Sequence, residues 1–177
     1  SISVSSLTQN LCAASRPGHF SGVATVCAKL FNQCRPDVAV FGEKDYQQLQ
    51  VIRRMVKDLD IPIEIYSVQT VREPDGLAVS SRNIYLDEEG RARAAHINGV
   101  LFETATRLSA GHQPSKELAS AAAELIEKVG SPPEYIELCD AETLASVQEL
   151  KASARLMTAI TVNKTRLIDN WPVAPTQ

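Results

Sequence analysis

The sequence lacks any excess of basic residues. Its 18 lysines and arginines are outnumbered by 21 aspartates and glutamates, which gives a formal net charge of −3. The two local basic runs, VIRRMVK and EEGRARAA, have the spacing of polar helix faces. Binding of a polyanion such as nucleic acid is therefore not expected, whereas a small anionic ligand stays open.

The sequence also lacks the patterns of metal and nucleophile chemistry. Its four cysteines form no CxxC pair and have no cysteine–histidine spacing suited to zinc; they are Cys12, Cys27, Cys34 and Cys139. We expect them to be buried, reduced thiols. The three histidines do not fit a Ser/His/Asp triad or a metal-binding pair, so no protein-held metal is predicted.

Long apolar runs are missing as well. No run approaches the roughly 20 residues of a membrane span, and no signal peptide is visible. With 44% hydrophobic and 22% charged residues, the composition is that of a soluble globular protein. A cytoplasmic protein without membrane contact is expected. The first residues, SISVSSLTQN, include no methionine, which suggests a processing or expression boundary.

The first part of the chain contains alternating helix and strand patterns. Residues 21–34 have helical spacing, and the apolar run at 37–41 is typical of a strand buried on both faces of a parallel sheet. A helix over 45–58 and a strand within 61–71 follow, and this order predicts an α/β fold. Because a doubly wound sheet normally has about five strands, residues 1–70 are interpreted as the C-terminal half of such a domain. The expected apolar helix faces comprise Val23, Val26, Cys27, Leu30, Phe31 and Cys34 in the first helix, and Leu49, Ile52, Met55, Val56 and Leu59 in the second.

The pattern changes in residues 71–177. A Pro-Asp-Gly turn separates two short extended pieces, and Asp87 is predicted to cap a helix that runs to about Ser109. Ser115 is predicted to cap a second helix that ends at Gly130. Three strand candidates follow, at 134–140, 154–161 and 165–170, the last two joined as a hairpin. We expect a small α+β domain of two helices on an antiparallel sheet.

The stretch FGEKDYQQ at 41–48 contains one residue that local structure does not explain. Asp45 and Gln48 have the spacing of a capping box, and Gly42 would suit a tight turn. Lys44 is different, because a helix N-terminus already carries a charge of roughly +0.5. Two positive features close together favour a bound anion such as phosphate. A nucleotide site and a solvated surface lysine both remain open.

Two further loops carry polar clusters. Ser80, Ser81 and Arg82 are followed by Asn83 and could hold several phosphate oxygens, although serines also form local turns. In the RPGHF loop, Arg16 and His19 bracket Pro-Gly, and such a histidine is more often structural than catalytic.

Several segments together resemble one enzyme family. The segments ASRPGHFSGVATVCAKLFN, PDVAVFGEKDYQQLQVIRRMV, VREPDGLAVSSRNIYL and TRLIDN occur in the order and spacing of the pantoate–β-alanine ligases, the pantothenate synthetase family. The resemblance covers nearly all of residues 1–171. That family is similar to the HIGH-signature nucleotidyltransferases, and AVSSRN looks like its version of their KMSKS loop.

This resemblance implies a Rossmann-like nucleotidyltransferase domain whose C-terminal half is residues 1–70, followed by a smaller lid domain at 71–177. It also implies the family's reaction. ATP and pantoate give pantoyl adenylate and pyrophosphate, with Mg²⁺ on the phosphates; β-alanine then displaces AMP to give pantothenate. The full-length family member is expected to be a homodimer.

The resemblance implies site residues in the first part. Lys44 would contact the ATP phosphates and act in catalysis, while Gly42 and Asp45 would lie at the ribose. Gln48 would hydrogen-bond pantoate. Arg16 would face the pocket for pantoate and β-alanine.

In the second part, the resemblance implies that Ser80 and Arg82 grip the phosphates and act in catalysis. Ser81 would support them, and Val79 would lie near the adenine. The sequence departs from the family pattern at Leu11–Ala14, where a glycine-containing segment is usual, and at Val79, where methionine or leucine is common. The family's PTMGxLHxGH signature is absent, and with it the histidines that stabilise the transferring phosphate, so the chain alone is expected to be inactive.

Two alternatives are kept. An adenylyl transferase on the same scaffold could act on a different acid. Alternatively, the chain could be a non-catalytic folding unit with at most weak nucleotide binding. Without the missing half, apolar sheet surface should be exposed and oligomerisation favoured.

Overall fold

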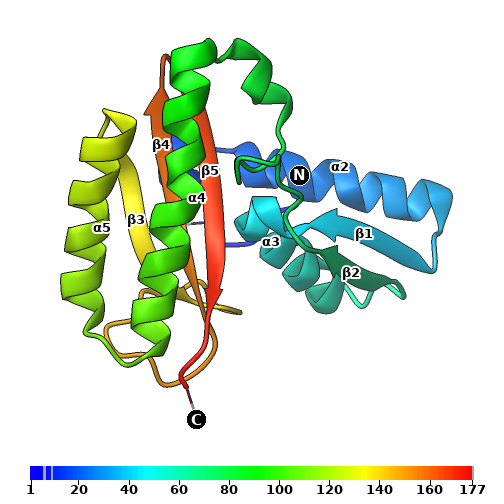
Figure 1. Cartoon of the computed structure of the whole chain (residues 1–177). Coiled ribbons are helices and arrows are strands. Elements are labelled where there is room, and N and C mark those ends of the chain that lie inside the picture. The colour runs from blue at the N-terminus through cyan, green and yellow to red at the C-terminus, as the bar shows by residue number, and fades with distance from the viewer. Residues whose placement is uncertain (6, 9, 177) are drawn as a thin grey trace. The chain divides into compact units, whose positions relative to one another are not determined.

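A computed structural model describes residues 1–5, 7–8 and 10–176. The chain divides into two compact units, Ser1–Gln69 and Thr70–Gln177. Figure 1 shows the elements of both, and each unit is described by itself below. In the part of the chain that the structure describes, no helix is both long enough and apolar enough to cross a membrane.

The first unit is an α/β arrangement. Its helices are α1 (Cys12–Ser15), α2 (His19–Cys34) and α3 (Tyr46–Asp58), with a short 3-10 helix, η1 (Glu43–Asp45), before α3. The strands β1 (Val38–Gly42) and β2 (Glu64–Val68) pair in parallel, with Gly42 opposite Val68 (Figure 1). The predicted helices, strands and parallel pairing are confirmed, whereas α1 lies in a segment expected to be loop.

The predicted burial of β1 is wrong. Val38 and Val40 are exposed, Val40 to 60%, and so are Tyr66 and Val68 on β2. The apolar run forms a parallel strand as expected, but the described residues cover only one face of it.

The predicted face of α2 is also displaced. Val26 and Leu30 are exposed, and the buried positions are Phe20, Ala24, Ala28 and Phe31. On α3, Leu49, Ile52 and Met55 are buried as expected, but Leu59 is exposed. The core of this unit therefore includes the buried face of α2, with Ala24 and Ala28, and the buried face of α3, and the two helices pack against each other.

The second unit has two helices on an antiparallel sheet, as predicted. The helices are α4 (Glu88–Ser109) and α5 (Pro114–Val129), which pack against each other and against the sheet (Figure 1). The strands β3 (Pro133–Asp140), β4 (Ala154–Val162) and β5 (Thr165–Val173) lie in the order β3-β4-β5. Before α4 comes a second 3-10 helix, η2 (Ser81–Tyr85).

Helix ends in this unit follow capping chemistry. Asp87 Oδ1 accepts a hydrogen bond of 2.7 Å from Gly90 N, which confirms the predicted cap of α4. Gly130 ends α5 with a φ of 79°, also as predicted. The Ser115 cap is wrong: Gln113 is the N-cap, because Pro114 takes the first helical position, where its missing N–H costs nothing.

We predict that Asp87→Ala destabilises the second unit by about 1–2 kcal/mol. The same carboxylate oxygen also accepts a hydrogen bond of 2.7 Å from Asn163 Nδ2 in the β4–β5 turn, so two contacts are lost. Chemical denaturation measures the free energy of unfolding of Asp87→Ala and of a control variant, Glu88→Ala, at the next position. Equal losses in the two variants would contradict the prediction.

Glu117 gives the fold a predicted acid dependence. Its carboxylate accepts a hydrogen bond of 2.6 Å from Arg107 Nε and lies 2.9 Å from His112 Nδ1. The Arg107 hydrogen bond, and then that of His112, hold the pKa of Glu117 below its usual value of 4.5. A lowered folded-state pKa contributes stability above the unfolded-state pKa, and this contribution is lost as the pH falls through the lowered one.

Glu117→Gln should therefore lose about 1 kcal/mol of unfolding free energy at pH 7, since Arg107 and His112 are partly exposed. The difference from the wild type should shrink below about pH 4. Glu127→Gln, on the exposed side of the same helix, is the control. Denaturation at a series of pH values measures both, and a pH-independent difference would contradict the prediction.

The cysteines only partly follow the prediction. All four are free; Cys12 and Cys139 are buried, Cys27 is half-buried and Cys34 is exposed. Burial, followed by the charges of Glu137 and Asp140, raises the pKa of Cys139 to about 12. Cys139 is therefore an inert core thiol, and the expectation of burial is wrong for Cys34.

Candidate functional site

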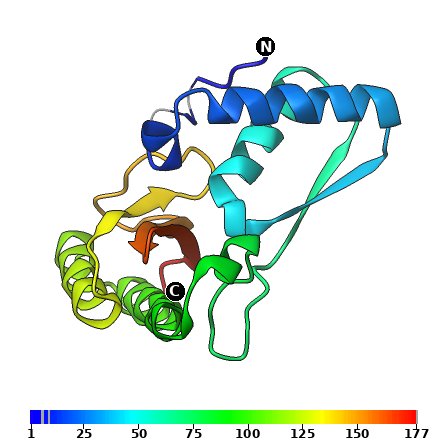
Figure 2. The same cartoon turned by 90° about the horizontal axis from the view of Figure 1, so that it is seen from above.

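The loop that contains Lys44 begins where β1 ends. Gly42 is the last residue of the strand, η1 spans the next three residues, and α3 starts at Tyr46. The two strands are parallel, so this loop lies at their carboxyl edge, beside the start of α3 (Figure 2). Ligands of parallel sheets bind beyond this edge.

Asp45 does not cap α3 in the predicted way. It occupies the N-cap position, but its side chain accepts no capping hydrogen bond. Its carboxylate instead lies 3.8 Å from the ammonium of Lys44, whose side chain is 21% exposed. The capping-box interpretation of Asp45 and Gln48 is therefore wrong, and Asp45 belongs with Lys44 in a charged cluster.

Gly42 is not required by the backbone. Its φ of −76° and ψ of 137° are extended values that any residue adopts, so the tight-turn interpretation is wrong. A Cβ atom at this position would meet no atom within 4 Å. The described residues thus leave open space beside Gly42, next to the Lys44 loop.

The two adjacent glutamines of α3 have different surroundings. Gln48 is half-buried. Gln47 is only 4% exposed, and its amide donates to Leu7 O at 2.9 Å and Asn10 O at 3.0 Å, while its Oε1 accepts from Cys12 N at 3.1 Å. Gln47 therefore fixes the N-terminal loop to the first turn of α3.

The sequence interpretation missed this role of Gln47. The available signal was the i, i+4 spacing of Gln47 and the apolar Val51, which puts both on one helix face. In the structure Val51 is fully buried.

Arg16 lies just beyond the loop that Gln47 holds. It ends α1, is partly exposed, and accepts a hydrogen bond of 3.2 Å from His19 N through its carbonyl. The His19 ring packs edge-on against Phe20, with 5.0 Å between ring centroids. The φ of 77° at Gly18 makes the turn into α2.

The Ser80–Asn83 loop of the second unit is held by two local hydrogen bonds and by one to β5. Ser80 Oγ accepts a hydrogen bond of 3.2 Å from Arg82 N, so it caps η2. Arg82 Nη1 donates to Arg166 O at 3.1 Å, and Asn83 Nδ2 donates to Ala78 O at 3.1 Å. Ser81 and Val79 lie beside them, the first at the start of η2 and the second exposed.

The predicted site residues thus form one group in each unit. Gly42, Lys44, Asp45 and Gln48 follow one another from the end of β1 through η1 into the first turn of α3, and Arg16 follows in sequence the loop that Gln47 holds. The second group, Val79–Arg82, lies entirely in the other unit.

Comparisons with known proteins agree on one family. The family model described as pantoate-beta-alanine ligase matches residues 1–172. The chain belongs to the pantoate-beta-alanine ligase family. It is 48% identical over 172 residues to pantothenate synthetase of Sphingopyxis alaskensis, a match that covers 97% of this chain and 62% of that protein.

Solved structures of this family have the same fold. The crystal structure of pantothenate synthetase from Thermus thermophilus superposes with a TM-score of 0.93 at 42% identity, covering 99% of this chain and 63% of that one. Pantoate-beta-alanine ligase from Francisella tularensis, in complex with beta-gamma ATP and beta-alanine, matches with a TM-score of 0.73 at 32% identity, covering 97% and 57%. This chain therefore spans about three fifths of the length of the relatives it matches.

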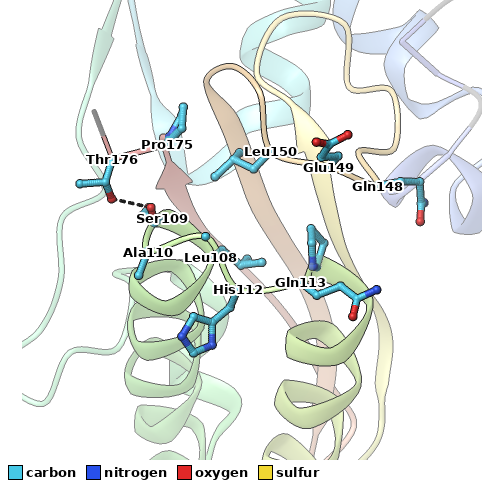
Figure 3. A pocket seen from close by; sticks show the side chains of 12 residues that line it. Leu108, Ser109, Ala110, His112, Gln113, Gln148, Glu149, Leu150, Pro175 and Thr176 are labelled. Atoms are coloured by element: carbon cyan, nitrogen blue, oxygen red, sulfur yellow. Dashed lines mark hydrogen bonds between the residues drawn. The ribbon is translucent and has the colours of Figure 1, made fainter.

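One hollow of this ligase-family chain is a cavity of about 540 Å³ in the second unit. Figure 3 shows its lining residues, where α4 and α5 meet the C-terminal residues. It is lined mainly by Leu108, Pro114, Gln148, Glu149, Leu150 and Pro175. None of the residues predicted from the sequence contributes to it.

In the part of the chain that the structure describes, no three histidines, cysteines or acidic residues come together as a metal-binding cluster.

Proposed function

We propose that this chain provides part of the ATP and substrate site of a pantothenate synthetase. The reaction is the ATP-dependent condensation of pantoate with β-alanine through pantoyl adenylate, giving pantothenate, AMP and pyrophosphate. The observation that carries the proposal is the Lys44 loop at the carboxyl edge of a parallel strand pair, in a chain of this ligase family. The Francisella tularensis relative, described in complex with beta-gamma ATP and beta-alanine, supports these two substrates.

Lys44 suits the first step for an electrostatic reason. A pantoate carboxylate that attacks a phosphate brings like charges together, so the site must supply positive charge at the α-phosphate. The ammonium of Lys44 lies close to the start of α3, whose N-terminus adds to the positive potential. Asp45, beside Lys44, has a carboxylate that could accept hydrogen bonds from ribose hydroxyls. The open space at Gly42 would let the nucleotide approach the backbone.

Gln48 and Arg16 are assigned to the organic acid. A half-buried amide such as that of Gln48 can donate to a carboxylate and accept from a hydroxyl, and pantoate has both groups. Gln47 fixes the loop that leads towards Arg16 and thereby limits how far Arg16 can move. Because adenylation creates a good leaving group, positioning is most of the catalytic task in both steps.

The second unit is assigned the role of a lid. Arg82 would bind phosphate oxygens, with Ser80 and Ser81 contributing hydroxyl groups and Val79 an apolar contact to adenine. Arg82 uses Nη1 for the Arg166 carbonyl, so its other N–H groups would face the phosphate, and the Ser80 hydroxyl can donate to a phosphate while its oxygen accepts from the Arg82 amide. Residues 1–70 and 71–177 are accordingly proposed as nucleotide-binding part and lid.

Mg²⁺ fits this site as an ion that arrives with ATP. It usually keeps several waters and is bound largely through substrate phosphates, so the ion would be held mainly by ATP, while Asp45 beside Lys44 remains assigned to the ribose. The ion would neutralise phosphate charge. The described residues supply the lysine, the arginine and the hydroxyl groups that orient those phosphates.

We further propose that the full-length protein is a cytoplasmic homodimer that binds pantoate, β-alanine and ATP, and neither nucleic acid nor membranes. The net charge of −3 supports the absence of nucleic-acid binding. Family resemblance supports the cytoplasmic location, the homodimer, the three substrates and the absence of membrane binding.

The activity can be tested in a chimaera. The chain replaces the region it matches in the Sphingopyxis alaskensis pantothenate synthetase, and pantothenate formation from pantoate, β-alanine and ATP is measured. The chimaera should be active, and the chain alone should not. An inactive but folded chimaera would contradict the proposal. A panel of other acids in pyrophosphate exchange would show whether a different acid is the substrate.

A second candidate is a non-catalytic folding unit that binds nucleotide weakly at most. The observation that favours it is the exposed apolar face of the first unit, formed by Val38, Val40, Tyr66 and Val68. Calorimetry of the chain with ATP and Mg²⁺ discriminates between the two. If ATP binding to the chain releases no heat, and the Lys44→Ala and Arg82→Ala variants give the same result, the folding unit is favoured.

A further inference from the structure

The arm that leads into the Ser80–Arg82 loop is a short hairpin. Its two sides are joined by an antiparallel bridge between Arg72 and Ala78, and Val79 N donates to Val71 O at 2.9 Å. At its turn, Gly76 has a φ of 90°, and a Cβ atom there would lie 2.6 Å from the amide nitrogen of Asn98. The hairpin therefore packs tightly on α4, and its second side runs directly into Ser80.

A buried ion pair fastens this hairpin to β5. Arg72 Nη1 lies 2.7 Å from Asp169 Oδ2, and Arg72 Nη2 lies 2.9 Å from Asp169 Oδ1. Asp169 is 5% exposed and the Arg72 side chain 18%. The guanidinium also lies 5.1 Å from the ring centroid of Trp171 and donates to Gly76 O at 3.2 Å. We call Arg72, Asp169 and Trp171 the clasp.

The loop is thus held to β5 at two points. Its leading arm is held by the clasp at Asp169, and its far side by Arg82, which donates to the carbonyl of Arg166 on the same strand. The second contact uses the very group that the proposed function assigns to phosphate. If Arg82 turns to a phosphate, the contact with Arg166 is weakened, whereas the clasp keeps the hairpin attached to β5.

We propose that Arg72 and Asp169 are positioning residues for the Ser80–Arg82 loop. They keep the loop in place on β5 while Arg82 binds a phosphate oxygen. Both side chains are committed to each other and do not touch the nucleotide. The inference rests on the proposed function of the loop, and it extends that function to residues of β5 and of the hairpin.

The geometry makes the role testable with a mild substitution. Arg72→Lys keeps the positive charge but cannot form two parallel hydrogen bonds with one carboxylate. Val129→Ala is the matched control: Val129 is buried in the core of the same unit, on α5, so its truncation lowers stability without touching the clasp. Trp171 is the only tryptophan of the chain, so its fluorescence reports whether the clasp is broken.

Three measurements decide the matter. In the chain, hydrogen exchange of the amides of residues 79–83 should become about tenfold faster in Arg72→Lys, with a changed Trp171 emission. In the chimaera, the KM for ATP should rise about tenfold, as expected for loss of one charge-assisted hydrogen bond, while the KM for β-alanine stays unchanged. Val129→Ala should show neither the loop exchange nor the KM effect.

The outcomes separate the inference from the proposed function. Unchanged exchange at 79–83 despite a changed Trp171 emission overturns the inference. So does faster exchange with an unchanged KM for ATP, or an equal effect of Val129→Ala. If Arg82→Ala alters the KM for ATP but Arg72→Lys does not, only the inference fails. If the chimaera makes no pantothenate, or Arg82→Ala has no effect, the proposed role of the loop fails and the inference falls with it.

Discussion

Lys44→Ala in the chimaera is expected to lower kcat/KM for ATP by about 10²–10³, the loss typical of removing one preorganised electrostatic group from a transition state. The reason is the position of the ammonium at the carboxyl edge of β1, beside the start of α3. Alanine leaves only the helix N-terminus to stabilise the phosphate charge. Steady-state kinetics with ATP as the varied substrate measure the effect.

Two further variants sharpen this test. Lys57→Ala removes a lysine from the exposed last turn of the same helix and should leave the kinetics unchanged. Lys44→Arg keeps the charge with a different shape and should retain part of the activity. If Lys44→Ala and Lys57→Ala behave alike, the phosphate role of Lys44 is wrong. A loss of thermal stability without kinetic change would assign Lys44 a structural role.

Local chemistry made the boundaries of many elements predictable. The Asp87 cap, the Gly130 terminator and the hairpin between β4 and β5 depend on a few neighbouring residues, so the sequence contains them completely. At Ser115 two local signals competed, and proline at the first helical position decided the start of α5.

Burial was less predictable, because it depends on what an element packs against. Helical spacing placed Val26 and Leu30 on an apolar face of α2, yet both are exposed and the buried face contains Ala24 and Ala28. The same holds for Val40, whose apolar run indicated two covered faces. The spacing of apolar residues shows which side chains share one face of a helix, but not which element packs against that face.

In the candidate site too, local features were predictable and contacts between distant residues were not. Lys44 was found because helix capping could not explain it, and the assumed Asp45 cap does not form. Gln47 and the clasp were missed, because their partners are distant in sequence: Arg72 and Asp169 are 97 residues apart. No local pattern marks such a pair before the fold is known.

The second large effect is expected for Asp169→Ala, which should destabilise the second unit by about 3–5 kcal/mol. The substitution leaves the largely buried Arg72 guanidinium without its carboxylate and removes the acceptor of a 2.7 Å hydrogen bond from Asn170 N. Chemical denaturation of the chain, followed by Trp171 fluorescence and circular dichroism, measures the change. Since 1 kcal/mol shifts Tm by about 2–4 °C in a chain of this size, the melting temperature should fall by about 6–20 °C.

The control for Asp169 is an arginine–aspartate ion pair of similar length on the surface. Arg54 Nε lies 2.8 Å from Asp58 Oδ2 on α3, and both side chains are about half exposed. Asp58→Ala should cost at most about 1 kcal/mol, because water already solvates both charges. The double variant Arg72→Met with Asp169→Met should lose less than Asp169→Ala alone, since no unpaired charge stays buried. Equal losses for Asp169→Ala and Asp58→Ala would show that burial does not set the strength of the clasp.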